Sequence, residues 1–108
     1  MMSVAVELSI TQDLAPTGAC RLHIQGELDI YTAPELAEAL ASVTDSQSVV
    51  VDLRRCRYID SSTISVLLRW RKTSKANMRI LVGRSGAVAR VLQITHVDSV
   101  IPVTIEDD

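Results

Sequence analysis

Residues 48–70 read Ser-Val-Val-Val-Asp-Leu-Arg-Arg-Cys-Arg-Tyr-Ile-Asp-Ser-Ser-Thr-Ile-Ser-Val-Leu-Leu-Arg-Trp, and this stretch carries the two signals that decide the fold. Residues 48–53 are a short, nearly continuous β-branched run, which predicts a central strand covered on both faces. The pattern of residues 62–76 predicts a helix, because at about 100° per residue its apolar side chains share one side. Four polar residues share the opposite, solvent-facing side: Ser62, Ser65, Arg69 and Lys72. A buried strand followed by an amphipathic helix is a unit of an α/β fold.

The chain before this stretch predicts a hairpin and a helix. Residues 4–10 and 21–25 are typical of strands, and the turn residues at 13–18 join them. Residues 26–31 are expected to form a loop. A helix begins after Thr32, which has the signature of an N-cap with Pro34 in the first turn and Glu35 three residues on.

The chain after this stretch predicts a strand, a short helix and a last strand. Residues 79–82 form the strand, and residues 83–86 form a turn in which Ser85 caps the helix. The last strand spans residues 100–105 and is expected at a sheet edge because of Pro102. The acidic end, residues 105–108, is expected to fray.

The predicted order is therefore β-β-α-β-α-β-α-β in a single domain spanning residues 1–108. Strands that alternate with helices imply right-handed crossovers, so the sheet is expected to be mostly parallel and mixed, with the first hairpin as an antiparallel edge.

Composition excludes several classes of protein. The chain of 108 residues has 13 acidic and 11 basic residues, a net charge of −2, which removes the basic footprint of a protein that binds nucleic acid directly. No apolar run approaches the roughly 20 residues that span a bilayer, so no membrane insertion is expected. The start of the chain has no secretory signal, and two cysteines are too few for a disulfide scaffold. We therefore expect a cytoplasmic protein.

The sequence does not contain the patterns of a catalytic triad, a phosphate-binding loop or a metal site. Ser61, His96 and Asp60 do not follow the order or turn of a known catalytic triad. Residues 83–86 contain two glycines before a helix but lack both phosphate-loop spacings. Cysteine and histidine residues are scattered without metal-ligand spacing. The sequence therefore predicts no enzyme, no cofactor and no metal.

Asp60 and Ser61 open the predicted helix after a buried parallel strand, where sites in open α/β sheets are common. In one interpretation, either residue simply caps the helix. In the other, Ser61 is a regulatory hydroxyl, because a phosphate there would meet free N–H groups and the positive end of the helix dipole. The residues alone favour the cap.

The resemblance of three segments to a known family favours the regulatory interpretation of Ser61. Residues 26–36 begin Gly-Glu-Leu-Asp, residues 49–53 read Val-Val-Val-Asp-Leu, and residues 58–62 read Tyr-Ile-Asp-Ser-Ser. In this order and spacing they resemble the STAS family, and in particular its stand-alone members, the bacterial anti-sigma factor antagonists. The resemblance covers nearly the whole chain, and it implies a sheet flanked by helices on one face.

The resemblance also implies a function. Members bind an anti-sigma factor that has serine kinase activity, and so release a sigma factor. The kinase phosphorylates the serine directly after the aspartate, here Ser61, which ends the interaction, and a serine phosphatase restores it. Asp29, in the Gly-Glu-Leu-Asp segment, is implied to lie close to Ser61. The expected partner-binding residues are Asp29, Asp60, Ser61, Ser62, Ser65, Arg69 and Lys72.

The chain departs from the family at Thr63, where the family usually has glycine, and at Ser65, where a second glycine is common. Ser62 and Thr63 are therefore alternative phosphorylation sites. The competing hypothesis is a STAS adaptor without a phosphorylation switch, for example a cytoplasmic subunit that regulates a membrane transporter.

Overall fold

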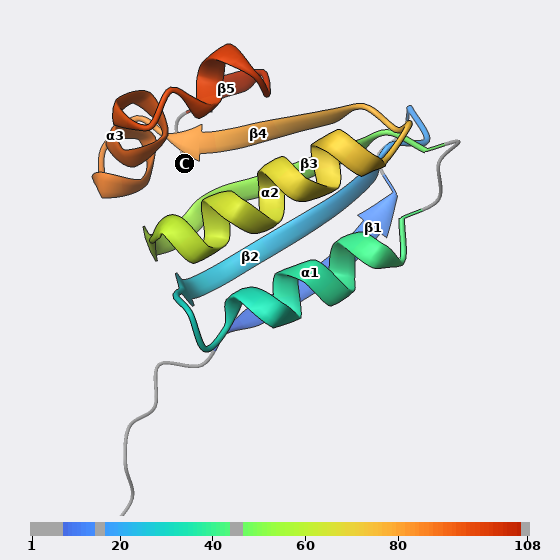
Figure 1. Cartoon of the computed structure of the whole chain (residues 1–108), viewed down its shortest axis with the longest axis horizontal. Coiled ribbons are helices and arrows are strands. Elements are labelled where there is room, and N and C mark those ends of the chain that lie inside the picture. Colours follow the sequence, from blue (N-terminus) through green and yellow to red (C-terminus); the bar gives the residue numbers. More distant parts are fainter. Residues whose placement is uncertain (1–7, 15–16, 44–46, 107–108) are drawn as a thin grey trace, which may run out of the picture.

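The computed structural model of the chain describes residues 8–14, 17–43 and 47–106. Strands and helices alternate through most of these ranges (Figure 1). The elements in chain order are β1 (Ser9–Leu14), β2 (Cys20–Leu28), α1 (Ala33–Ala41), β3 (Val49–Ile59), α2 (Ser61–Thr73), β4 (Met78–Gly83), α3 (Ala87–Ile94), the 3-10 helix η1 (Val97–Ser99) and β5 (Val103–Glu106).

The strands form one mixed sheet in the order β1-β2-β3-β4-β5. β1 pairs with β2 in antiparallel orientation, and every other pair is parallel. The predicted α/β fold, with its antiparallel hairpin at one edge and its last strand at the other, is confirmed. Because the three interior strands run in the same direction, their carboxyl ends and the loops that follow them meet at one end of the sheet.

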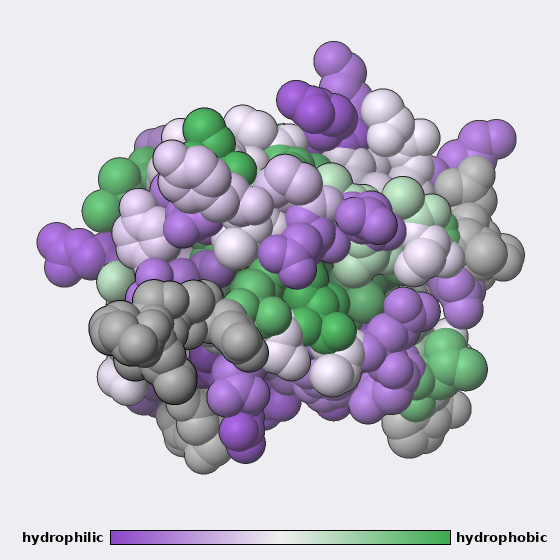
Figure 2. All heavy atoms as spheres, turned by 90° about the horizontal axis from the view of Figure 1, so that it is seen from below, coloured by the Kyte–Doolittle hydropathy of each residue, from purple (hydrophilic) through white to green (hydrophobic). Residues whose placement is uncertain are grey.

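The helices lie on one face of the sheet, where α1 and α2 run side by side and α3 covers the end near β4 (Figure 1). Alternate residues of the strands point toward them, so the core is a single layer between sheet and helices. Leu22 and Val51 from the sheet meet Leu36 and Leu67 from the helices there, and all four are fully buried. Seen from below, hydrophobic side chains of the protein are exposed in a strip near the centre of the molecule (Figure 2). Partly buried Ile10 of β1 packs against the core.

The prediction that helices or other elements cover both faces of β3 is wrong. No helix lies on the second face in the part of the chain that the structure describes (Figure 1). The first five residues of β3 are nevertheless buried. On the second face Val50 is covered by Ala19 and Leu81, and Asp52 by charged neighbours. Neighbouring side chains on the same face of the sheet thus bury these residues without a second layer.

The boundaries of the N-terminal elements differ from the prediction. Residues 4–7 and Pro16 of the expected strand and turn lie outside the described residues, and β1 runs on to Leu14. β2 continues through Gly26 to Leu28, so the first half of the predicted loop is strand. Local polarity suggested a loop, but pairing with β3 supplies the backbone hydrogen bonds that keep this segment extended.

The C-terminal elements differ in two ways. Gly86, not Ser85, is the N-cap of α3, at a φ of 121° that only glycine adopts without strain. Ile105 and Glu106, expected in a frayed tail, belong to β5, because their backbone pairs with Val82 and Gly83. α2 begins at Ser61 and ends at Thr73, close to the predicted helix.

Candidate functional site

The N-terminus of α2 is held by Asp60, as one of the two interpretations predicted. The carboxylate Oδ1 of Asp60 accepts hydrogen bonds from the backbone N–H groups of Ser62 at 3.0 Å and Thr63 at 3.4 Å. The cap therefore does not depend on Ser61, whose side chain is exposed at the first position of the helix. An exposed hydroxyl that the fold does not use is available for modification.

Thr63 faces the opposite way. Its side chain is fully buried, and its hydroxyl donates to the carbonyl oxygen of Leu28 at 3.1 Å. This bond joins the start of α2 to the end of β2, the residue before Asp29. A kinase has no access to a buried threonine without local unfolding, so the folded chain offers Ser61, and partly Ser62, as acceptors.

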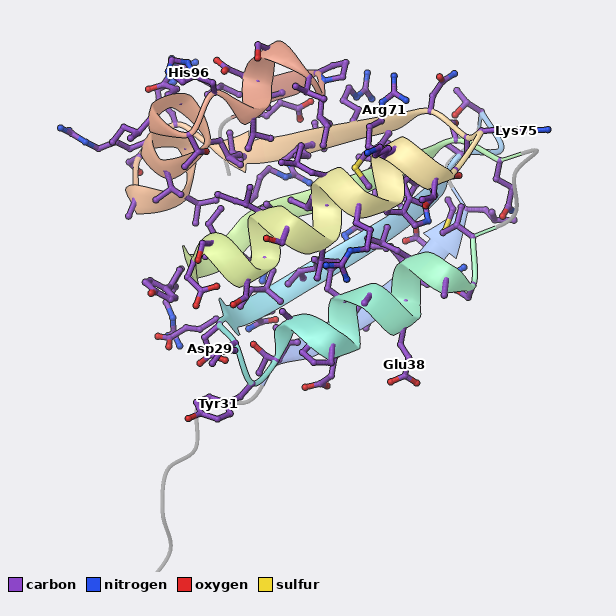
Figure 3. All side chains as sticks on the ribbon, viewed as in Figure 1. Asp29, Tyr31, Glu38, Arg71, Lys75 and His96 are labelled. Atoms are coloured by element: carbon purple, nitrogen blue, oxygen red, sulfur yellow. The ribbon has the colours of Figure 1, made fainter. Side chains whose placement is uncertain are left out.

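The loop between β2 and α1 is organised by Asp29. Its Oδ1 accepts from the backbone N–H groups of Tyr31 at 2.9 Å and Thr32 at 3.0 Å, and lies 3.1 Å from the Thr32 hydroxyl oxygen. Desolvation opposes ionisation of this carboxyl, but the bonds from Thr32 and Tyr31 outweigh it and lower the pKa of Asp29. The loop is thus built around a carboxylate, and Figure 3 shows it at the same end of the sheet as the start of α2.

The side-chain cap predicted for α1 at Thr32 is wrong, although the position of the N-cap is correct. Thr32 is the N-cap residue, but its side chain makes no capping bond. Its hydroxyl instead donates to the Glu27 carbonyl and accepts from the Asp29 N–H. The competing bonds arise because β2 ends so close to the helix that loop groups are nearer than the helix N–H groups.

The polar side of α2 is largely as predicted. Ser65, Arg69 and Lys72 are exposed, and Ser62 is half-buried. Neither Arg69 nor Lys72 forms an ion pair within the described residues. Exposed Ser61, Ser65, Arg69 and Lys72 thus belong to one helix, and the Asp29 loop lies at the end of the sheet where that helix begins (Figure 3).

Two large exposed side chains near this site were not predicted from the sequence. Ile30 is 64% exposed and Tyr31 is 86% exposed, both in the loop that Asp29 organises. Tyr31 projects from the molecule in Figure 3. A signal was present, because a large aliphatic and an aromatic residue occupy a segment where turns favour small polar residues. Such exposed side chains are typical anchors of protein interfaces.

The alternatives to this site find no support in the geometry. The Asp60 carboxylate is engaged by helix N–H groups, and no hydrogen bond within the described residues joins it or Ser61 to His96. Cys20 and Cys56 are buried, and burial raises the pKa of both thiols. Thiols in that state are poor nucleophiles and metal ligands.

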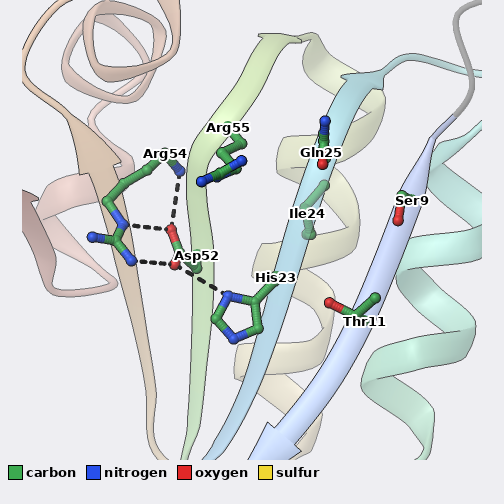
Figure 4. Close-up of a pocket in the computed structure, with 8 residues that line it drawn as sticks. All are labelled: Ser9, Thr11, His23, Ile24, Gln25, Asp52, Arg54 and Arg55. Carbon is green, nitrogen blue, oxygen red and sulfur yellow. Dashed lines mark hydrogen bonds and ion pairs between the residues drawn. The ribbon is translucent and has the colours of Figure 1, made fainter. Parts of the chain in front are cut away.

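The uncovered face of the sheet carries a charge network centred on Asp52 (Figure 4). The carboxylate accepts from Arg54 Nε at 2.9 Å and Nη2 at 2.7 Å, and lies 3.4 Å from Nδ1 of His23. His23 Nε2 lies 3.0 Å from Asp13, and Arg54 also faces Glu106. Burial would raise the pKa of Asp52, but the hydrogen bonds and charge of Arg54 lower it overall. The network links β1, β2, β3 and β5.

Comparisons with known proteins are consistent with this fold. A family model described as "Mlab, STAS domain" matches residues 12–103. The anti-sigma-B factor antagonist of Listeria monocytogenes is 29% identical over 86 residues, which are 76% of this chain and 75% of that protein. The same-named protein of Staphylococcus aureus is 31% identical over 78 residues, 68% of this chain and 72% of its own.

Solved structures agree in fold. An anti-sigma factor antagonist from Mycobacterium paratuberculosis superposes with a TM-score of 0.83 at 23% identity, covering 94% of this chain and 89% of its own. The anti-sigma factor antagonist SpoIIAA in its unphosphorylated form gives a TM-score of 0.59 at 16% identity, covering 93% and 89%. At these identities the likeness concerns the fold alone. None of the helices in the described part of the chain is long and apolar enough to cross a membrane.

Proposed function

Because the chain belongs to the STAS domain family, we propose that it is an anti-sigma factor antagonist, which binds an anti-sigma factor and so releases a sigma factor. The curated relatives that match 68–76% of this chain over 72–75% of their own length have this name. The observation that carries the proposal is the exposed Ser61 hydroxyl at the start of α2, a helix whose N-terminus is capped by Asp60 without it. The protein is then a binding module of the cytoplasm and not an enzyme.

The proposed partner is an anti-sigma factor with serine kinase activity. It would contact Asp29, Asp60, Ser61, Ser62, Ser65, Arg69 and Lys72, with Ile30 and Tyr31 as apolar anchors. Phosphorylation of Ser61 would end the interaction, and a serine phosphatase would restore it. The phosphate adds about −1.5 to −2 charges at a helix N-terminus, a position that tolerates anions, so the fold survives while the interface is lost.

Mass spectrometry tests this mechanism directly. After incubation with ATP and the candidate kinase, the protein should gain one phosphate, located on Ser61, because that hydroxyl is exposed. Ser61→Ala should abolish the modification. Ser48→Ala, which removes an exposed serine just before β3 and outside the proposed interface, should retain it. A phosphate on another residue, or none with an active kinase, contradicts the switch.

A second candidate function is a STAS adaptor without a phosphorylation switch, such as a subunit that regulates a membrane transporter. The departure from the family's pattern at Thr63, two residues after Ser61, favours it. This candidate shares the fold and the surface. It predicts binding to a partner that is independent of Ser61 phosphorylation.

Tyr31 is the residue whose truncation should most weaken partner binding without a charge change. Tyr31→Ala should weaken binding of the anti-sigma factor about 30-fold, since a central aromatic anchor is worth about 2 kcal/mol. The melting temperature should not change, because the side chain is 86% exposed. Titration calorimetry measures the first and thermal unfolding the second.

The matched control is Ile94→Ala, which removes an exposed aliphatic side chain from α3, away from the loop. It should leave affinity unchanged. Equal effects of the two substitutions would show that Tyr31 contributes only general surface hydrophobicity.

A further inference from the structure

The uncovered face of the sheet, opposite the helices, is rich in arginine. The neighbours of Arg21 and Arg79 along their strands belong to the core under the helices, so these two side chains point to the uncovered face. Arg55 of β3 lines a hollow of about 620 Å³ on the same face (Figure 4). The other polar residues of this hollow are Ser9, Thr11, His23, Gln25, Asp52 and Arg54. The hollow is thus polar and has more positive than negative charge.

Arginines of this face lack a counter-charge, whereas the acidic side chains of the sheet have one. Arg21, Arg55 and Arg79 form no ion pair within the described residues. Each described acidic side chain of the strands lies within 4.0 Å of a basic group. These pairs are Asp13–His23, Glu27–Arg57, Asp52–Arg54 and Glu106–Arg54. The uncovered face therefore has positive charge that the described part of the chain does not neutralise, although the net charge of the whole chain is −2.

The three arginines are too far apart to bind one small anion together. Arg21 and Arg79 flank Val50 on the two neighbouring strands, so their backbones lie two strand spacings apart, or about 10 Å. Arg55 follows Val50 farther along β3, at roughly 15 Å. An extended peptide rises about 3.3 Å per residue and points alternate side chains to one face, so carboxylates a few residues apart match these distances. Carboxylates also pair with guanidinium groups through two parallel hydrogen bonds.

We propose that the uncovered face of the sheet binds an extended acidic segment of another protein. A nucleic acid fits this face less well, because none of the described residues that line the hollow is a Trp, Tyr or Phe on which bases could stack. The face lies opposite α2 (Figure 1). The chain can therefore hold this segment and the anti-sigma factor of the proposed function at the same time.

Fluorescence anisotropy of a labelled decapeptide that alternates glutamate and serine tests the proposal. At about 50 mM NaCl the whole chain should bind this peptide with a Kd of about 100 µM or below, and about 500 mM NaCl should abolish binding because salt screens exposed charges. The same peptide with glutamine in place of glutamate should not bind. An oligothymidine of ten nucleotides should bind at least about tenfold more weakly than the acidic peptide. Tighter binding of the oligonucleotide would overturn the choice of a protein partner.

Charge reversals locate the site. Arg55→Glu and Arg79→Glu should each weaken peptide binding about tenfold, because each places a negative charge against the carboxylates of the peptide. Arg90→Glu is the matched control, since it reverses an exposed arginine on α3, on the side of the helices, and should bind like the original chain. All three side chains are exposed, so the melting temperatures should stay the same.

Nuclear magnetic resonance gives a second readout. The acidic peptide should shift the amide signals of β2, β3 and β4 and leave those of α2 in place. Absence of binding, an equal loss for the Arg90 variant, or shifts centred on α2 would overturn the proposal. Because no anti-sigma factor is present in these measurements, their failure is distinct from a failure of the proposed function.

Discussion

Replacing Ser61 with aspartate should weaken binding of the anti-sigma factor about 100-fold, or about 2.7 kcal/mol. The added carboxylate stands beside the Asp60 carboxylate at the start of α2, where the proposed interface is centred. A like charge placed against acidic groups of a partner costs several kcal/mol. Titration calorimetry with the purified partner measures the loss.

The same substitution should leave stability nearly unchanged. Asp60 already caps α2 through the Ser62 and Thr63 N–H groups, and an anion in the first turn interacts favourably with the helix dipole. The melting temperature of the Ser61→Asp variant should therefore stay within about 3 °C of the original, a change below about 0.5 kcal/mol.

Two controls separate charge from position. Ser61→Ala removes the hydroxyl without adding charge and should bind normally. Ser48→Asp adds the same charge at an exposed serine just before β3, at the opposite end of that strand, and should also bind normally. A large fall in melting temperature for Ser61→Asp would mean that Ser61 is a structural residue, and the regulatory interpretation would then be rejected.

Asp52→Asn is expected to produce the largest loss of stability, about 3 kcal/mol, which corresponds to a fall of about 15 °C in melting temperature. Asp52 is only 5% exposed and accepts two bonds from the Arg54 guanidinium and one from the Arg54 backbone N–H. Asparagine keeps the shape but leaves the Arg54 charge without its closest counter-charge. Urea unfolding at pH 7 measures the difference.

The difference in stability between the original chain and Asp52→Asn should shrink as the pH falls. The pKa of Asp52 is lowered in the folded state by Arg54, with a contribution from His23. Its stabilising contribution is therefore present above the unfolded pKa of about 3.9 and is lost as pH falls through the folded value. The stability curves of the original chain and of Asp52→Asn should converge below about pH 4.

Asp13→Asn is the matched control, because this carboxylate also faces His23 but its side chain is 61% exposed. Exposed pairs contribute about 0.5 kcal/mol, so this variant should unfold almost like the original. If Asp52→Asn lowered the free energy of unfolding as little as Asp13→Asn, the Asp52–Arg54 pair would stabilise the fold no more than an exposed ion pair does.

Sequence patterns predicted the structure correctly where the interacting groups lie within a few residues of each other. The alternation of apolar and polar residues predicted the hairpin and the faces of α2, because side-chain direction follows from backbone period. A cap at Asp60 or Ser61 was predicted, because capping bonds reach only two and three residues along the chain, and the structure assigns it to Asp60. The serine that follows it was selected by resemblance, and the structure leaves it exposed.

Prediction failed where the partner of a residue is distant in sequence. The segment around Gly26 has the composition of a loop but pairs with β3 as strand. Thr32 has the signature of a cap, yet its hydroxyl bonds to the Glu27 carbonyl. The apolar anchors Ile30 and Tyr31 were overlooked, since only the folded loop shows that both are exposed.

The sequence by itself determined the order of the elements, the parallel sheet with one antiparallel edge, and the hydroxyl at the start of α2. These depend on periodicity and on hydrogen bonds within a few residues. Only the tertiary structure decided that Thr63 is buried against Leu28, 35 residues away, and that His23 of β2 lies 3.4 Å from Asp52 of β3. Those contacts depend on strand register and helix placement, which are set by packing of the whole core and are not encoded in any single segment.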